Sequence, residues 1–236
     1  MTTRAALLAF CLFLPFQSFG GAALPTAPEV PRDALQEGAE LFVNECQTCH
    51  GLSFVRFGQL AELGFSEKEI AEKLLAGAPG EFMRVAAKRD DQKRWFGVAP
   101  PDLSLTVRAH ASSEGSGADW LYAYLRSFRR DDASPTGWNN DVFTKVAMPH
   151  VLWRMQDATN PEEGAADALS PEDYDRRVAT LVGFLAWAGD PHAALRKRVG
   201  IGVVAFLLVF SALAYALKRE YWRDITGDRR QETGGR

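Results

Sequence analysis

The sequence predicts a mainly α-helical protein with one C-terminal transmembrane helix. Apolar side chains return to one helical face in three stretches, at 35–46, 119–130 and 170–187. No strand-like alternation is long enough to predict a sheet, and no internal repeat is present. A further stretch, 199–217, contains 19 residues without a charge or a proline. At about 1.5 Å per residue this helix would be roughly 28 Å long, enough to span a bilayer core.

The chain begins with the pattern of an export signal. A short positive region precedes an apolar run at 5–16, and small residues suitable for a signal peptidase follow at 20–23. We therefore expect residues 1–23 to be a signal peptide that is cut near Ala23. We interpret Cys11, inside the apolar run, as an apolar residue lost on processing. The mature chain then keeps two cysteines.

Those two cysteines belong to the motif Cys46-Gln47-Thr48-Cys49-His50. Two thiols at this spacing can each bond a vinyl group of a porphyrin, and the adjacent imidazole can bind its iron. The motif predicts one covalent haem c on Cys46 and Cys49, with His50 as an axial ligand. A redox dithiol would require a βαβ unit and a zinc site a second Cys or His pair, and the sequence shows neither.

Each soluble helix has a start signal in the sequence. The first predicted helix ends at the haem motif, with its apolar face leading to Cys46. Side-chain caps predict the starts at Asp33 with Gln36, at Ser66 with Glu69, at Asp119, and at Ser170 with Asp173. Residues 82–95 are charged and predict an irregular surface segment. Residues 157–175 are acidic and predict an exposed loop.

The membrane topology follows from the exported haem. Three basic residues flank the apolar stretch on each side, so flanking charge alone does not orient it. Because haem c is attached outside the cytoplasmic membrane, we expect the haem domain, 24–195, to lie in the periplasm. The anchor at 196–220 would then cross the bacterial inner membrane once, with the tail, 221–236, in the cytoplasm. Three further arginines in that tail agree with this orientation.

Charge is divided between these parts of the chain. Residues 24–195 contain 17 Lys and Arg against 26 Asp and Glu, a net charge of −9. Residues 196–236 contain 9 against 4, a net charge of +5. The acidic domain would attract a basic partner and repel nucleic acid, although ordinary solubility explains the same composition. We expect 157–175 to form part of the surface that a basic partner contacts.

The second iron ligand has to come from elsewhere in the chain. The candidates are Met83, Met148, Met155, His110, His150 and His192. A thioether raises the reduction potential of the iron, whereas a second imidazole leaves it lower. Met148 stands on a non-helical apolar segment stiffened by Pro149, which suits a ligand delivered by a loop. We therefore favour Met148 and keep His150 and Met83 as alternatives.

A tandem proline, Pro100-Pro101, precedes Asp102-Leu103-Ser104. Two prolines fix an extended backbone that donates no hydrogen bonds. Such a segment can lie against a flat apolar ring, and it can equally form a plain rigid turn.

Several motifs together resemble those of the cytochrome c1 family in its proteobacterial form, over the whole mature chain. They are the haem motif followed by 52–56, Trp95–Val98, Pro100–Ser104, Ala118–Tyr122, Pro135–Asn140, Met148–Trp153 and the C-terminal anchor. In addition, Gly38 and Phe42 with 181–187 resemble the crossed first and last helices of class I cytochromes c. The resemblance implies a class I cytochrome c-like haem domain with long loop insertions.

For the site, the resemblance implies His50 and Met148 as axial ligands, with Pro100 and Pro101 bordering the haem. One departure is visible after the Pro100–Ser104 motif. The family usually has Arg-x-Arg there, with the second arginine near a haem propionate, whereas this chain has Arg108-Ala109-His110. Either Arg108 or His110 would take that role.

In function, the resemblance implies an electron-transfer subunit of the quinol–cytochrome c reductase, without catalytic chemistry of its own. It would pass electrons from a Rieske iron–sulfur protein to a soluble basic cytochrome c. It would stand beside cytochrome b in a dimeric complex of a respiratory or photosynthetic chain. The alternative is another membrane-anchored monohaem cytochrome that feeds a terminal oxidase. A haem enzyme or gas sensor, which needs an open iron position, and a structural zinc module are more distant rivals.

Overall fold

The computed structural model describes residues 24–233 except 75–77, 86, 114 and 157–167. The segment predicted as a signal peptide therefore lies outside the described residues. Contacts divide the chain into two units, Met1–Gly189 and Asp190–Arg236. The first unit contains helices α2 (Leu35–Leu41), α3 (Glu67–Lys73), α4 (Arg89–Phe96), α5 (Thr106–Ala109), α6 (Gly117–Arg126), α7 (Trp153–Gln156) and α8 (Pro171–Gly189). It also contains the 3-10 helices η1 (Arg32–Ala34) and η3 (Phe57–Leu63) and the π-helical segment η2 (Phe42–Cys46).

The prediction of a mainly helical fold is confirmed, but the described residues also contain two small antiparallel sheets. Strand β1 (Leu52–Arg56) pairs with β2 (Phe82–Met83), and β3 (Phe128–Arg130) pairs with β4 (Trp138–Asn140). The strands are too short to show an alternating pattern in the sequence. Residues 82–95, predicted to be irregular, contain both β2 and α4, so that prediction is wrong.

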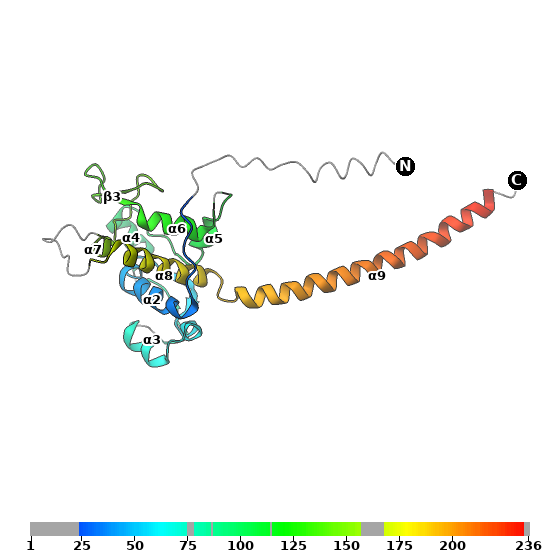
Figure 1. The fold of residues 1–236 in the computed structure, drawn as a ribbon, viewed down its shortest axis with the longest axis horizontal. Coiled ribbons are helices and arrows are strands. Elements are labelled where there is room, and N and C mark those ends of the chain that lie inside the picture. Colours follow the sequence, from blue (N-terminus) through cyan, green and yellow to red (C-terminus); the bar gives the residue numbers. More distant parts are fainter. Residues whose placement is uncertain (1–23, 75–77, 86, 114, 157–167, 234–236) are drawn as a thin grey trace. The chain divides into compact units, whose positions relative to one another are not determined.

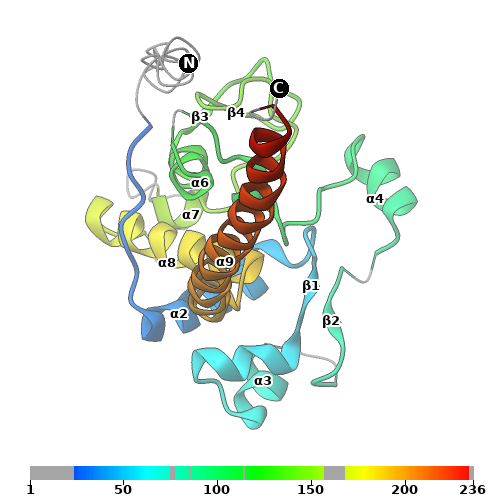
Figure 2. The same ribbon diagram turned by 90° about the vertical axis from the view of Figure 1, so that its right-hand side faces the viewer.

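Three helices form the centre of the first unit, with α8 lying between α2 and α6 (Figures 1 and 2). At the crossing of α2 with α8, a Cβ on Gly38 would lie 2.1 Å from the carbonyl oxygen of Thr180. Only glycine lets the two backbones approach so closely. Beside it the fully buried rings of Phe42 and Phe184 pack with centroids 5.7 Å apart. The crossing fixes the helix that leads into the haem motif.

Two of the predicted helix starts are confirmed. Ser66 and Glu69 form a reciprocal capping box at the start of α3. At the start of α8 the amide of Asp173 donates to Ser170 Oγ across 3.1 Å. In both cases the cap and its partner are three residues apart, so the sequence alone contains the whole interaction.

The other two predicted starts are wrong. Helix α6 is capped by Ser116, and Asp119 is the third helical residue, which accepts a hydrogen bond from the Ser116 amide across 2.9 Å. The first helical stretch begins at η1, and no side-chain cap is present at η1 or α2 in the structure. Asp33 lies inside η1, where it cannot cap α2.

The second unit contains one long helix, α9 (Ala193–Thr233). Its part Ala193–Arg223 has a mean hydropathy of 2.4 over its most apolar window and is the one candidate span in the described chain. None of that window is buried within the protein. Helix α9 is therefore long and apolar enough to cross a membrane, and it contains the predicted anchor, 196–220.

Candidate haem site

The haem motif follows α2 and η2 as a further helical turn. The amides of Cys49 and His50 both donate to the carbonyl oxygen of Cys46, across 3.0 and 2.8 Å. This turn keeps the two thiols and the imidazole together. Both cysteines are free thiols, Cys46 buried and Cys49 partly buried. Burial, together with the charge of Glu45, raises the pKa of Cys46 to about 12.

The orientation of the His50 ring is fixed by one hydrogen bond. Its Nδ1 lies 2.7 Å from the carbonyl oxygen of Pro101, so Nδ1 carries the proton and donates it. This tautomer leaves Nε2 unprotonated, as an iron ligand requires. Burial also lowers the pKa of His50, against the opposite effect of the Pro101 hydrogen bond, and so favours the neutral ring.

The segment with the tandem proline lies along the residues that follow His50. Three hydrogen bonds join them: Leu103 N to Gly51 O (2.9 Å), Ser53 N to Asp102 Oδ2 (2.8 Å) and Phe54 N to Ser104 Oγ (3.2 Å). Pro100 is half-buried and Pro101 is exposed. The structure therefore places Pro101 beside the imidazole, and the contact of Pro100 and Pro101 with a haem ring stays a prediction.

A residue that the sequence did not reveal also supports the motif. Gln92 on α4 is buried, and its Nε2 donates to the carbonyl oxygen of Cys49 across 3.0 Å. This carbonyl lies at the end of the helical turn, where it has no backbone partner in a continuing helix. Gln92 stands in a charged run, so no sequence signal distinguished it from a solvent-exposed side chain.

Met148 lies in the irregular segment between β4 and α7, half-buried against the hydrophobic core. The hydroxyl of Tyr124, on α6, donates to Met148 Sδ across 3.5 Å. Burial raises the pKa of Tyr124 to about 12, so the hydroxyl keeps its proton at neutral pH. The thioether is thus held at the domain core by a polar contact that the sequence did not predict.

The remaining ligand candidates have other surroundings. Met83 is fully buried in β2, opposite Leu52 of β1. Met155 is partly buried on α7. His192 belongs to the second unit, whereas the haem motif belongs to the first. In this structure Met83 lies in the hydrophobic core and Met155 packs against it.

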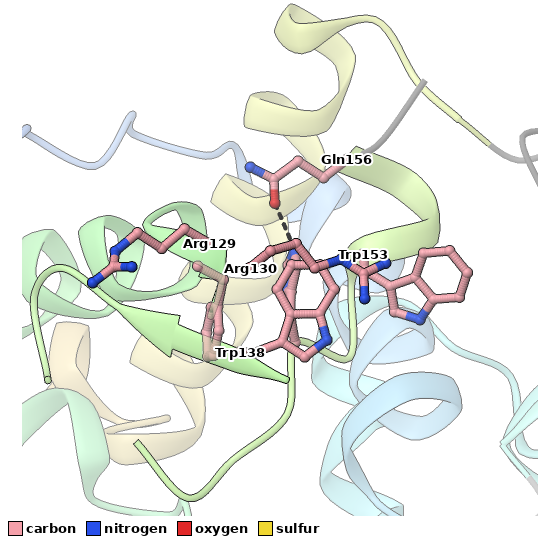
Figure 3. Close-up of a pocket in the computed structure, with 7 residues that line it drawn as sticks. Arg129, Arg130, Trp138, Trp153 and Gln156 are labelled. Atoms are coloured by element: carbon pink, nitrogen blue, oxygen red, sulfur yellow. Dashed lines mark hydrogen bonds between the residues drawn. The ribbon is translucent and has the colours of Figure 1, made fainter. Parts of the chain in front are cut away.

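His150 is almost completely buried, and its Nε2 forms a hydrogen bond with Gln156 Oε1. Its ring stacks on Phe128 with centroids 4.9 Å apart, and burial lowers its pKa to about 4. These contacts occupy one nitrogen and one face of the ring. A cavity of about 280 Å³ adjoins it (Figure 3), lined by Phe128, Arg129, Arg130, Trp138, His150, Trp153 and Gln156.

The two candidates for the propionate contact lie at the C-terminal end of α5. The exposed ring of His110 stacks on Trp120 with centroids 3.6 Å apart. The aliphatic part of the Arg108 side chain passes Gly189, where an added Cβ would lie 3.6 Å from Arg108 Cγ. The choice between Arg108 and His110 stays open.

The donor set fits a haem of the c type. Two reduced thiols stand on one turn, an imidazole is held through Nδ1, and a thioether lies against the same core. No group of three or more His, Cys, Asp or Glu side chains that could hold a metal ion occurs in the part of the chain that the structure describes. A structural zinc site would need a second pair of ligands, and the described residues contain no such group.

The helical fold and this donor set define a c-type cytochrome, a haem protein of electron transport. A model described as "Cytochrome C1 family" matches residues 27–225, and the chain belongs to the cytochrome c1 family. Membership of this family implies haem c as the cofactor.

Curated relatives match over most of the chain. "Cytochrome c1" of Allochromatium vinosum is 38% identical and aligns over 94% of this chain and 99% of its own. "Ammonia monooxygenase gamma subunit" of Nitrosomonas europaea is 41% identical and aligns over 93% of this chain and 97% of its own. "Cytochrome c1" of Rhodospirillum rubrum is 31% identical, over 81% of both chains.

Proposed function

We propose that this chain is the haem subunit of a quinol–cytochrome c reductase and passes single electrons from a Rieske iron–sulfur protein to a soluble c-type cytochrome. One observation carries the proposal within the cytochrome c1 family. The imidazole of His50 is bound through Nδ1 to Pro101, so the haem motif and the tandem-proline segment form one unit. This arrangement leaves Nε2 unprotonated and available for iron.

Each site residue has a defined task in this proposal. Cys46 and Cys49 would hold one haem c through thioether bonds, and His50 Nε2 and Met148 Sδ would occupy the two axial positions. The bound haem supplies one-electron redox chemistry. With His50 and Met148 both bound to the iron, no coordination position would be left for a substrate. The chain would thus contribute electron transfer and no bond-making step.

The membrane arrangement completes the proposal. Helix α9 would anchor the chain once in a bacterial inner membrane, with the haem domain in the periplasm and the C-terminus in the cytoplasm. The partners in the membrane would be cytochrome b and the Rieske subunit, in a dimeric complex. The name of the Allochromatium vinosum relative supports the assignment.

A different function is suggested by the name of the Nitrosomonas europaea relative. A monooxygenase that uses haem needs an open or labile iron position, so exogenous ligands separate the two functions. We expect the reduced native protein not to bind carbon monoxide and the pigment to stay with the protein in acidified acetone. Rapid carbon monoxide binding would contradict the electron-transfer proposal, and extraction of the pigment would contradict covalent attachment.

Purification and kinetics test the assignment to the reductase. Solubilised in mild detergent, the full chain should co-purify with cytochrome b, and its haem should be reduced by a reduced Rieske protein within single turnovers. Reduced chain should then reduce a basic soluble cytochrome c. Purification without cytochrome b, together with electron delivery to a terminal oxidase, would instead identify the alternative, a tethered monohaem cytochrome.

A further inference from the structure

We propose that Tyr124 is a positioning residue for Met148, whose sulfur it holds by a hydrogen bond that raises the reduction potential of the iron. The inference rests on the proposed function, because it takes Met148 as an axial ligand. The hydroxyl donates to Met148 Sδ across 3.5 Å, within the range of a hydrogen bond to sulfur.

The Tyr124 ring is fixed between two other aromatic rings. Trp120 and Tyr124 are four residues apart on one face of α6, and Phe128 follows at the start of β3. The Tyr124 ring stacks on Trp120 with centroids 5.2 Å apart and meets Phe128 edge-on, also at 5.2 Å. Tyr124 is itself buried. Because both neighbouring rings pack against it, its hydroxyl has one direction in which to point.

The segment that carries Met148 is tied to the same turn of α6 through Asn140. This side chain is fully buried, and its Nδ2 donates to the carbonyl oxygen of Tyr124 across 2.7 Å. Its Oδ1 accepts hydrogen bonds from the amides of Val142 and Phe143, both across 2.9 Å. Tyr124 therefore contacts the segment 140–148 twice: its backbone carbonyl accepts from Asn140, and its hydroxyl donates to Met148.

The neighbouring asparagine fixes the segment further along. Asn139 Oδ1 accepts a hydrogen bond from the amide of Lys145 across 2.9 Å. Lys145 has a backbone φ of 60°, a left-handed conformation that residues other than glycine rarely adopt. The backbone therefore turns sharply three residues before Met148, and Asn139 holds that turn. The position of the sulfur follows from these anchored residues.

The chemical consequence concerns the electron density on the sulfur. A hydroxyl that donates a hydrogen bond to a thioether withdraws electron density from the sulfur lone pairs, so the sulfur becomes a weaker donor to iron. Ferric iron, with its extra positive charge, loses more stabilisation than ferrous iron when the donor weakens. The hydrogen bond from Tyr124 therefore raises the potential, in the same direction as thioether ligation itself.

The test compares Tyr124→Phe with Tyr122→Phe in the full-length haem protein. Phenylalanine keeps the ring that packs at each position and removes only the hydroxyl. Tyr122 is also buried on α6, but its ring lies beneath the guanidinium of Arg126, 4.8 Å away. The measurements are the midpoint potential, the weak near-infrared sulfur-to-iron band of the ferric protein, and binding of added imidazole to ferric haem.

For Tyr124→Phe we expect a lower midpoint potential, a shifted near-infrared band and weaker imidazole binding, because a sulfur that donates more strongly to ferric iron is harder to displace. The Tyr122→Phe protein should match the parent in all three measurements. Parental values for Tyr124→Phe would overturn the inference while leaving the proposed function intact. Equal shifts in both variants would also overturn it, since they would report general loosening of α6. Absence of the band from the parent protein would contradict ligation by Met148, and with it the proposed function.

Discussion

His50 donates from Nδ1 to the carbonyl oxygen of Pro101 across 2.7 Å, although the two residues are 51 positions apart in the chain. This contact joins the haem motif to the tandem-proline segment. Because proline fixes φ and lacks an amide proton, the carbonyl of Pro101 is presented from a stiff backbone. The ring orientation is thus set by the protein before any contribution from a metal.

Replacing Asp102 should weaken the link between these two segments. Its carboxylate accepts hydrogen bonds from the amides of Ser53 and Ser104, across 2.8 and 2.9 Å. We expect Asp102→Ala to lower the free energy of unfolding by roughly 1.5–3 kcal/mol, the range for hydrogen bonds to a charged group. Urea unfolding followed by circular dichroism measures this loss. Asp132→Ala, at an exposed position, is the control, and an equal loss there would contradict the role of Asp102.

Replacing Asn140 should release the segment that carries Met148. In Asn140→Asp the donor to the Tyr124 carbonyl becomes an acceptor, and a fully buried site receives a carboxylate. We expect a loss of at least about 2 kcal/mol in the free energy of unfolding, because removing one partner leaves buried polar groups unsatisfied. The near-infrared sulfur band should also weaken.

The control for this variant is Asn44→Asp, the same chemical change at an exposed position. Equilibrium unfolding and the ferric spectrum are recorded for both proteins. If Asn140→Asp unfolds at the parental denaturant concentration, the buried asparagine does not stabilise the ligand segment.

The features that the sequence predicted correctly depend on residues close together in the chain. The capping box of Ser66 with Glu69 spans three positions, and the apolar part of α9 is continuous. The first helix leads into Cys46 as its apolar face predicts. In such cases spacing alone determines which groups meet.

The features that the sequence did not reveal are contacts between distant polar groups. Gln92 reaches the Cys49 carbonyl from 43 positions away, and no periodicity identifies one glutamine in a charged run. Asn140 and Tyr124 meet because β4 pairs with β3, the strand that follows α6, and this pairing is decided by tertiary packing. The sequence predicts the start of α6 three residues too late because Asp119 resembles a cap, whereas in the structure Ser116 and Asp119 form the capping box together.

Association with a basic cytochrome should depend on the acidic surface. Within the predicted acidic segment, 157–175, residues 157–167 lie outside the described part, and Asp175 and Asp173 pair with Arg126 and Arg176. We expect Glu162→Lys with Glu163→Lys to slow association several-fold at low salt and much less at high salt, because salt screens exposed charges. Stopped-flow kinetics over a range of ionic strength measures the effect.

A charge-matched control for that pair is Glu29→Lys with Glu67→Lys, at two exposed positions elsewhere on the domain. It changes net charge equally, so a smaller effect would assign the docking surface to the acidic segment. If the association rate of the parent protein does not depend on ionic strength, electrostatic docking is contradicted.

The central claim is that Met148 and His50 bind the iron of one covalently attached haem. The most direct measurement is the ferric near-infrared spectrum and midpoint potential of Met148→Ala, beside Met155→Ala as a methionine control. The account predicts loss of the sulfur-to-iron band and a large fall in potential for Met148→Ala, with parental values for Met155→Ala. An unchanged spectrum and potential in Met148→Ala would contradict it and move the ligand to His150 or Met83.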